Sequence, residues 1–174
     1  MGLPYSILEV DMNTKSIAHC AMLTALAMIF GYVEALIPFH FGLPGIKLGL
    51  ANLVIVLALY RLPAGQVFAI QGMRIVLVSF LFGSMSMMIY SLAGGFLSLL
   101  TMFLLKNTNW FSITGISIVG GVSHNLGQLM VAVLVVQNLK ITFYVPVLLT
   151  AGLMTGCLIG MLAYKLKPLM ERYF

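Results

Sequence analysis

The chain is organised around one stretch, residues 34–52, which reads Glu34-Ala-Leu-Ile-Pro-Phe-His-Phe-Gly-Leu-Pro-Gly-Ile-Lys-Leu-Gly-Leu-Ala-Asn52. It places an acid, a histidine, a lysine and an amide inside a sequence that is otherwise almost entirely apolar. Two prolines, one of them in a Pro44-Gly45 pair, interrupt any helix there, because proline lacks the N–H of a helical bond and the pair favours a turn. The stretch therefore predicts a shaped loop between two apolar spans, with polar groups at the mouth of a membrane protein.

The composition of the whole chain agrees with this interpretation. Hydrophobic residues make up 61% of the 174 residues and charged residues 7%, and the mean hydropathy is +1.10. This composition cannot supply the polar shell of a water-soluble domain. We expect an all-α integral membrane protein with one membrane domain over residues 15–174, preceded by an N-terminal tail over residues 1–14.

The long apolar runs predict six transmembrane helices, because a spanning helix needs about 20 apolar residues. They lie at residues 17–37, 48–60, 63–82, 85–105, 113–137 and 142–164. An even number of spans puts both termini on one side of the membrane.

The basic residues indicate which side that is. Lysines 47 and 140 fall on the side opposite the termini. The terminus side carries Lys15, Arg61, Lys106, Lys165, Lys167 and Arg172. Because cytoplasmic loops are enriched in lysine and arginine, we expect a multi-pass protein of the cell membrane with both termini cytoplasmic. The loop at residues 39–47 then faces outward.

Small residues predict where helices pack closely. Gly152, Gly156 and Gly160 form two overlapping GxxxG units on the sixth span, and Ala21 and Ala25 form a similar small-residue unit on the first. Such faces allow the backbone of another helix to approach. For the sixth span the sequence favours packing within the monomer over a partner protein; for the first span the two alternatives are nearly equal.

The fourth and fifth spans carry matching glycine pairs, at residues 94–95 and 120–121. Each pair follows a serine by three residues, in Ser91-Leu-Ala-Gly-Gly95 and Ser117-Ile-Val-Gly-Gly121. We expect these two spans to cross at their glycine pairs.

The polar residues of the spans are predicted to share one layer. At a rise of about 1.5 Å per residue, Arg74 and His124 each lie roughly 16 Å from the inner ends of their spans, near the midplane. The others fall at this depth or further out. The candidate ligand-binding residues are Glu34, Lys47, Asn52, Arg74, His124, Asn125 and Gln128.

Arg74 is the residue on which the function of this layer depends. It keeps its proton, so at mid-membrane it needs a counter-ion or an anionic ligand. If Glu34 neutralises Arg74, the two form a structural pair. If Glu34 instead pairs with Lys47, Arg74 is free to hold a carboxylate or a phosphate. The sequence leaves both alternatives open.

The sequence lacks the residue patterns that metal binding, ATP binding and dithiol chemistry require. Three scattered histidines and a single acid within the spans make no metal set. The chain has no GxxxxGK[ST] loop for ATP, and Cys20 and Cys157 belong to no CxxC pattern. We therefore expect neither a metal nor a cofactor.

Five segments resemble the Gx transporter family, also described as heptaprenyl diphosphate synthase component I. They are Glu34-Ala-Leu-Ile-Pro38, Pro44-Gly-Ile-Lys-Leu-Gly-Leu-Ala-Asn52, Gly72-Met-Arg74, Ser91-Leu-Ala-Gly-Gly95 and Ser123-His-Asn-Leu-Gly-Gln128. The resemblance covers about residues 15–167. That family is similar in turn to the substrate-binding S components of energy-coupling factor (ECF) vitamin transporters.

The resemblance implies a fold and a set of partners. S components have six helices, cytoplasmic termini and a ligand pocket in the outer half, capped by the first outer loop. They dock through an AxxxA motif of the first helix, which Ala21 and Ala25 match here, onto a transmembrane coupling subunit driven by two ATPases. On this resemblance the chain is an ECF-type substrate-binding subunit for a small or amphiphilic, anionic ligand, such as an isoprenoid or a quinone.

The synthase name points to an alternative function. Prenyl-chain elongation in the known enzymes uses two aspartate-rich motifs that hold magnesium, whereas this chain has one aspartate, Asp11. We therefore expect that the chain is not itself an enzyme. The alternative is a membrane accessory subunit in isoprenoid or quinone synthesis, or in membrane redox chemistry.

Overall fold

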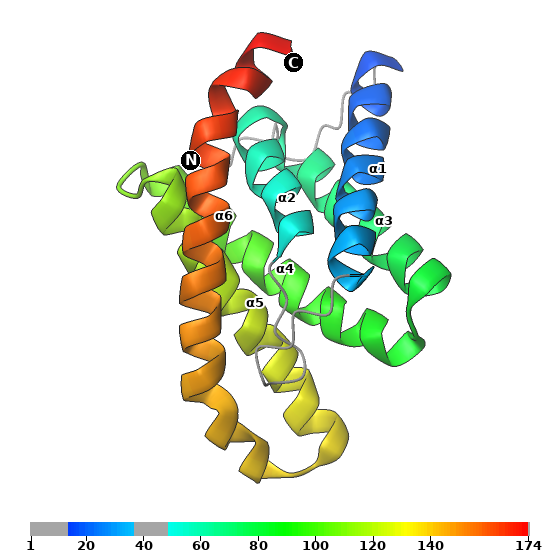
Figure 1. The fold of residues 1–174 in the computed structure, drawn as a ribbon, viewed down its shortest axis with the longest axis vertical. Coiled ribbons are helices and arrows are strands. Elements are labelled where there is room, and N and C mark those ends of the chain that lie inside the picture. The colour runs from blue at the N-terminus through cyan, green and yellow to red at the C-terminus, as the bar shows by residue number, and fades with distance from the viewer. Residues whose placement is uncertain (1–13, 37–48, 174) are drawn as a thin grey trace, which may run out of the picture.

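The computed structural model describes residues 14–36 and 49–173, which form six α-helices and one short 3-10 helix (Figure 1). The elements are α1 (Thr14–Leu36), α2 (Leu50–Arg61), α3 (Ala64–Phe82), α4 (Met85–Thr108), α5 (Ile113–Val136), η2 (Leu139–Tyr144) and α6 (Val145–Tyr173). Each helix begins within one turn of its predicted start. The predicted outer loop at residues 39–47, Lys47 itself and residues 1–13 of the predicted tail lie outside the described residues.

Five of these helices are long and apolar enough to cross a membrane, whereas α2 is not. With 12 residues, α2 is about 18 Å long, well short of the ~30 Å hydrocarbon core. The second predicted span is therefore a helix, as expected, but too short to be a full span by itself.

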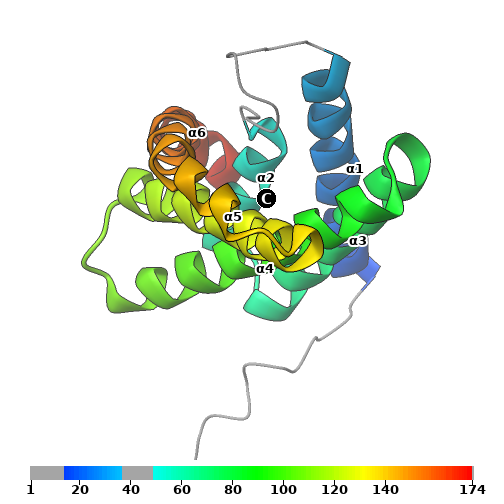
Figure 2. The ribbon, with the colours of Figure 1, turned by 90° about the horizontal axis from the view of Figure 1, so that it is seen from below.

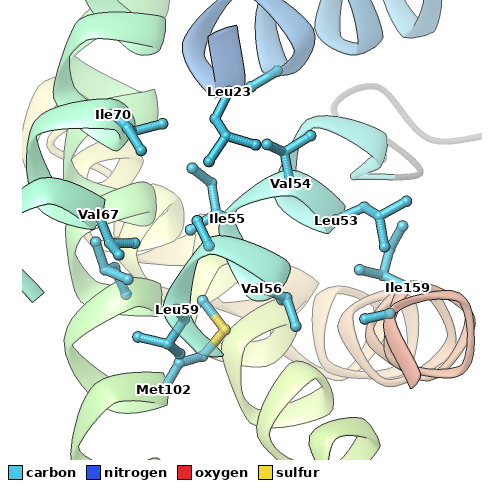
Figure 3. Close-up of a cluster of buried hydrophobic side chains, with 14 of the residues drawn as sticks. Leu23, Leu53, Val54, Ile55, Val56, Leu59, Val67, Ile70, Met102 and Ile159 are labelled. Atoms are coloured by element: carbon cyan, nitrogen blue, oxygen red, sulfur yellow. The ribbon is translucent and has the colours of Figure 1, made fainter. Parts of the chain in front are cut away.

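The short helix α2 is the centre of the hydrophobic core. Figure 2 shows it enclosed between α1 and α6. Seven of its residues are buried: Ala51, Leu53, Val54, Ile55, Val56, Ala58 and Leu59. The other side chains of this core come from all five other α-helices and include Leu23, Val67, Ile70, Met102 and Ile159 (Figure 3).

The outer surface of the bundle is apolar. Leu134 of α5 is 74% exposed, Phe80 of α3 69% and Met154 of α6 68%. Large exposed side chains of this kind would drive aggregation in water, but they match the acyl chains of a bilayer. The chain is a multi-pass membrane protein.

The three glycines predicted to pack helices lie where α6 meets α5. A Cβ on Gly156 would lie 2.6 Å from the Cα of Ile118, and one on Gly160 would lie 2.6 Å from the Cα of Thr114. Gly152 faces the backbone of α5 in the same way. These glycines thus set a backbone-to-backbone contact within the monomer.

The helices α4 and α5 also meet at glycines, but in another register than predicted. A Cβ on Gly94 would lie 2.7 Å from the carbonyl oxygen of His124, and one on Gly127 would lie 2.8 Å from the Cα of Gly94. Gly121 faces Gly152 of α6 instead. The predicted crossing of the two glycine pairs was wrong because α4 and α5 are joined by a short turn and run antiparallel, so residues equidistant from that turn face each other.

Candidate ligand-binding site

The amino end of α2 is held by an acid from another helix. The N-cap residue Gly49 has a φ of 80° and no side chain to cap the helix. Its N–H donates to Oε1 of Glu34 at 2.6 Å, and the N–H of Leu50 donates to Oε2 at 3.1 Å. Because the first N–H groups of a helix lack partners and carry partial positive charge, a carboxylate is well placed there. Glu34, on α1, thereby joins α1 to α2.

The carboxyl end of α2 is held by a base from another helix. Nζ of Lys106, on α4, donates to the carbonyl oxygen of Leu59. The Nζ atoms of Lys106 and Lys167 each lie 5.4 Å from the ring centroid of Tyr60. The charges at the two ends of α2 therefore both complement the helix dipole.

A cavity of about 140 Å³ lies beside the amino end of α2, and all six α-helices contribute to its wall. Every described residue of the predicted ligand set lines it: Glu34, Asn52, Arg74, His124, Asn125 and Gln128. Lys47, the seventh member of the set, lies outside the described residues. The fold therefore brings together, around one cavity, the described residues that were predicted to share one layer.

Arg74 is oriented by a neighbour on its own helix. Its Nε donates to Oε1 of Gln71 at 2.8 Å. Gln71 is fully buried and packs on Gly95 of α4, where a Cβ would lie 2.5 Å from its Nε2. The two terminal nitrogens of Arg74 have no hydrogen-bond partner among the described residues.

Glu34 and Arg74 do not form an ion pair in the described part of the chain. The charge of Glu34 does act on Arg74 through space, but its two oxygens are bound to the backbone of α2. The structure thus gives Glu34 a partner that the sequence-based alternatives did not include.

The remaining predicted residues differ in what they contact. Nδ2 of Asn125 donates to the carbonyl oxygen of Leu148 at 2.8 Å and so links α5 to α6. Oδ1 of Asn52 is buried and has no hydrogen-bond partner among the described residues. His124 and Gln128 pack on Gly94, whose Cβ would lie 2.8 Å from Cγ of Gln128. Asn125 thus has a structural partner, whereas Asn52 has an unused polar atom.

Two residues of this region were missed by the sequence analysis. Gln71 precedes Arg74 by three residues, a spacing that puts both on one helix face, so the pattern could have predicted it. Ser79 gave no signal; it is 7% exposed, lines the cavity and makes no hydrogen bond through its hydroxyl to any described residue. No three His, Cys, Asp or Glu side chains gather as a metal would need within residues 14–36 and 49–173.

The size of the cavity limits what it can hold. Its volume of about 140 Å³ is close to that of an engineered cavity of ~150 Å³ that binds benzene. Pockets for drug-sized ligands measure about 300–1,000 Å³. A carboxylate or phosphate head group fits inside, whereas a long isoprenoid chain would have to extend between helices or into lipid.

These features define a multi-pass α-helical membrane protein with a small polar cavity inside its bundle. The chain belongs to the family described as heptaprenyl diphosphate synthase component I, which matches residues 23–166. Neither a curated protein nor a solved structure matches the chain. The family resemblance inferred from sequence is thus confirmed, while the further similarity to ECF S components stays a prediction.

Proposed function

We propose that this chain is a membrane-embedded binding subunit that holds the anionic head group of a small or amphiphilic ligand in the cavity. The observation that carries this proposal is Arg74, whose terminal nitrogens make no hydrogen bond to any described residue. An arginine inside a bundle is costly unless something pairs with it. A bound anion would supply that pairing.

The family description supports one version of this function. A protein called component I of a synthase works with a further component, and heptaprenyl diphosphate is an anionic head on a long apolar chain. With one aspartate in its sequence, this chain would bind the lipid-like substrate or product while a partner carries the metal-dependent elongation. In this version the chain is an accessory subunit and not the catalyst.

Mass spectrometry of the protein after gentle purification tests ligand binding. We expect an anionic amphiphile to be released from the wild type and to be lost from Arg74→Gln, because hydrogen bonds to charged groups contribute about 1.5–3 kcal/mol each. Arg61→Gln is the matched control, since Arg61 is exposed at the far end of α2. If Arg74→Gln retains as much anion as Arg61→Gln, the cavity is not the binding site.

One observation favours uptake by an ECF-type transporter as a second candidate. Ala21 and Ala25 are both exposed on α1, which packs against α2 and α3 through its other face. An exposed pair of small residues in a membrane allows another helix to approach closely. In this version, the cavity faces outward, the termini are cytoplasmic, and a coupling subunit with two ATPases docks on α1.

Association with a partner separates the two candidates. The double variant Ala21→Leu/Ala25→Leu should fold normally and lose a coupling subunit and its ATPases in affinity purification, whereas Ala21→Ser/Ala25→Ser, which keeps both residues small, should retain them. Copurification of a soluble protein with aspartate-rich motifs, unaffected by the leucines, would instead support the accessory subunit.

A further inference from the structure

The amino end of α2 needs an acceptor that α2 itself does not provide. Its N-cap residue is Gly49, whereas most helices are capped by a Ser, Thr, Asp or Asn side chain. Among the described residues, only Glu34 accepts hydrogen bonds from the N–H groups of Gly49 and Leu50, and it reaches them from α1. Any other anion that entered the cavity could take the same two bonds.

The cavity beside these N–H groups contains unused polar atoms. Ser79 is more than nine-tenths buried and lines the cavity, and its hydroxyl makes no hydrogen bond to any described residue. Arg74 lines the same cavity, and its terminal nitrogens also make no hydrogen bond to any described residue. A hydroxyl and a guanidinium are donors to an oxyanion, and so is a helix amino end.

We propose that the amino end of α2 is an oxyanion site, and that Glu34 occupies it in the empty protein until the carboxylate or phosphate head group of a ligand displaces it. Glu34 then acts as an internal stand-in for the ligand. The displaced group would leave two N–H donors, the Ser79 hydroxyl and Arg74 to hold the incoming head group. This inference rests on the proposed binding function. It adds the position of the head group, at the amino end of α2, and the group with which it competes, Glu34.

This proposal explains why a cavity that binds anions contains an acid, Glu34. Without an acceptor, the N–H groups at the start of α2 would be unsatisfied inside the bundle, which is costly in a membrane. Glu34 satisfies them when no ligand is bound, and the competition lowers the affinity to a level from which the ligand can be released. A neutral side chain at position 34 should therefore bind the anion more tightly.

Calorimetric titration of protein in phosphatidylcholine nanodiscs tests this competition. The probes are farnesyl diphosphate, farnesol as the tail without the anion, and inorganic diphosphate as the head without the tail. We expect Glu34→Gln to bind farnesyl diphosphate about tenfold more tightly than the wild type, because the probe no longer displaces a carboxylate. Farnesol should bind both equally, and Arg74→Gln should weaken only the diphosphates.

Two further measurements separate the possible sources of the anion and guard against misfolding. Adding phosphatidylglycerol to the nanodiscs should weaken farnesyl diphosphate binding if a lipid head group fills the site, and should leave it unchanged if a soluble anion does. In wild-type protein labelled with ¹⁵N-glycine, the amide resonance of Gly49 should shift when farnesyl diphosphate saturates the protein. This second test needs no variant at Glu34.

The outcomes distinguish this inference from the function on which it rests. If Glu34→Gln binds no more tightly and the Gly49 resonance stays in place while Arg74→Gln still weakens binding, the inference is wrong and the binding function stands. If the wild type binds none of the three probes and retains no anion, both are wrong.

Discussion

The α5–α6 pair and the short helix α2 are fixed in the bundle by different interactions. Where α6 crosses α5, glycines bring the two backbones so close that no Cβ would fit. The ends of α2, in contrast, are bound by the side chains of Glu34 and Lys106, which come from α1 and α4. The first contact depends on shape alone, the second on charge.

This difference shows where the protein can change its state. Glycine-packed backbones have one arrangement, since dispersion contacts are lost steeply with distance. A charged cap can be exchanged for another charge of the same sign without moving the helix. We therefore expect α5 and α6 to form the rigid wall of the cavity, and the amino end of α2 to be its responsive part.

The largest effect is expected from filling the α5–α6 contact. Gly156→Leu places a side chain where even a Cβ would lie 2.6 Å from the backbone of Ile118, so the helices must separate. We expect a loss of about 3 kcal/mol or more of unfolding free energy. Thermal unfolding can be followed by dye labelling of the half-buried thiols of Cys20 and Cys157.

A neighbouring position on the same helix is the control. Met154 is 68% exposed, so Met154→Leu should change the stability by less than about 0.5 kcal/mol. Equal melting temperatures for Gly156→Leu and Met154→Leu would show that shape does not fix this pair.

A smaller effect is expected at the charged end of α2. Lys106→Met keeps most of the side-chain volume and removes the bond from Nζ to Leu59. We expect a loss of about 1–2 kcal/mol, because a charge-assisted bond to a helix carboxyl end is lost. Lys165→Met, at an exposed position, is the matched control. A Lys106→Met variant as stable as Lys165→Met would mean that charge does not hold α2.

Much of this fold could be predicted from the sequence, because hydropathy alone determines where apolar helices begin. The membership of the cavity was predictable for the same reason: polar residues in apolar helices are few, and depth along each helix places Arg74 and His124 in one layer. Antiparallel pairing across a short turn would also have predicted that Gly94 faces Gly127 rather than the pair at 120–121.

The partners of the polar residues could not be predicted. In the sequence, Glu34 and Arg74 are opposite charges, and an ion pair between them was one of the two predicted alternatives. Backbone N–H groups are not visible as donors in a sequence, so the binding of Glu34 to Gly49 and Leu50 gave no signal. The length of α2 was visible, but the fact that its amino end lies at the cavity depends on tertiary packing.

The smallest effect on stability, and the sharpest test of the cavity, is expected at Gln71. This residue is fully buried, and its Nε2 has no hydrogen-bond partner in the described part of the chain, so Gln71→Met removes an unsatisfied group and one bond to Arg74 at similar volume. These changes oppose each other, and we expect the unfolding free energy to stay within about 1 kcal/mol of the wild type.

Gln71→Met should weaken anion binding, although it changes the stability little. Without Oε1 of Gln71, the guanidinium of Arg74 loses its hydrogen bond to a described residue, and retention of an anion should fall several-fold because the donor must be ordered by the ligand itself. Gln71→Glu extends the test, since a carboxylate at this position neutralises Arg74 and should abolish retention. If Gln71→Met binds as well as the wild type, the orientation of Arg74 does not depend on Gln71, and the responsive part of the cavity is confined to Glu34 and the amino end of α2.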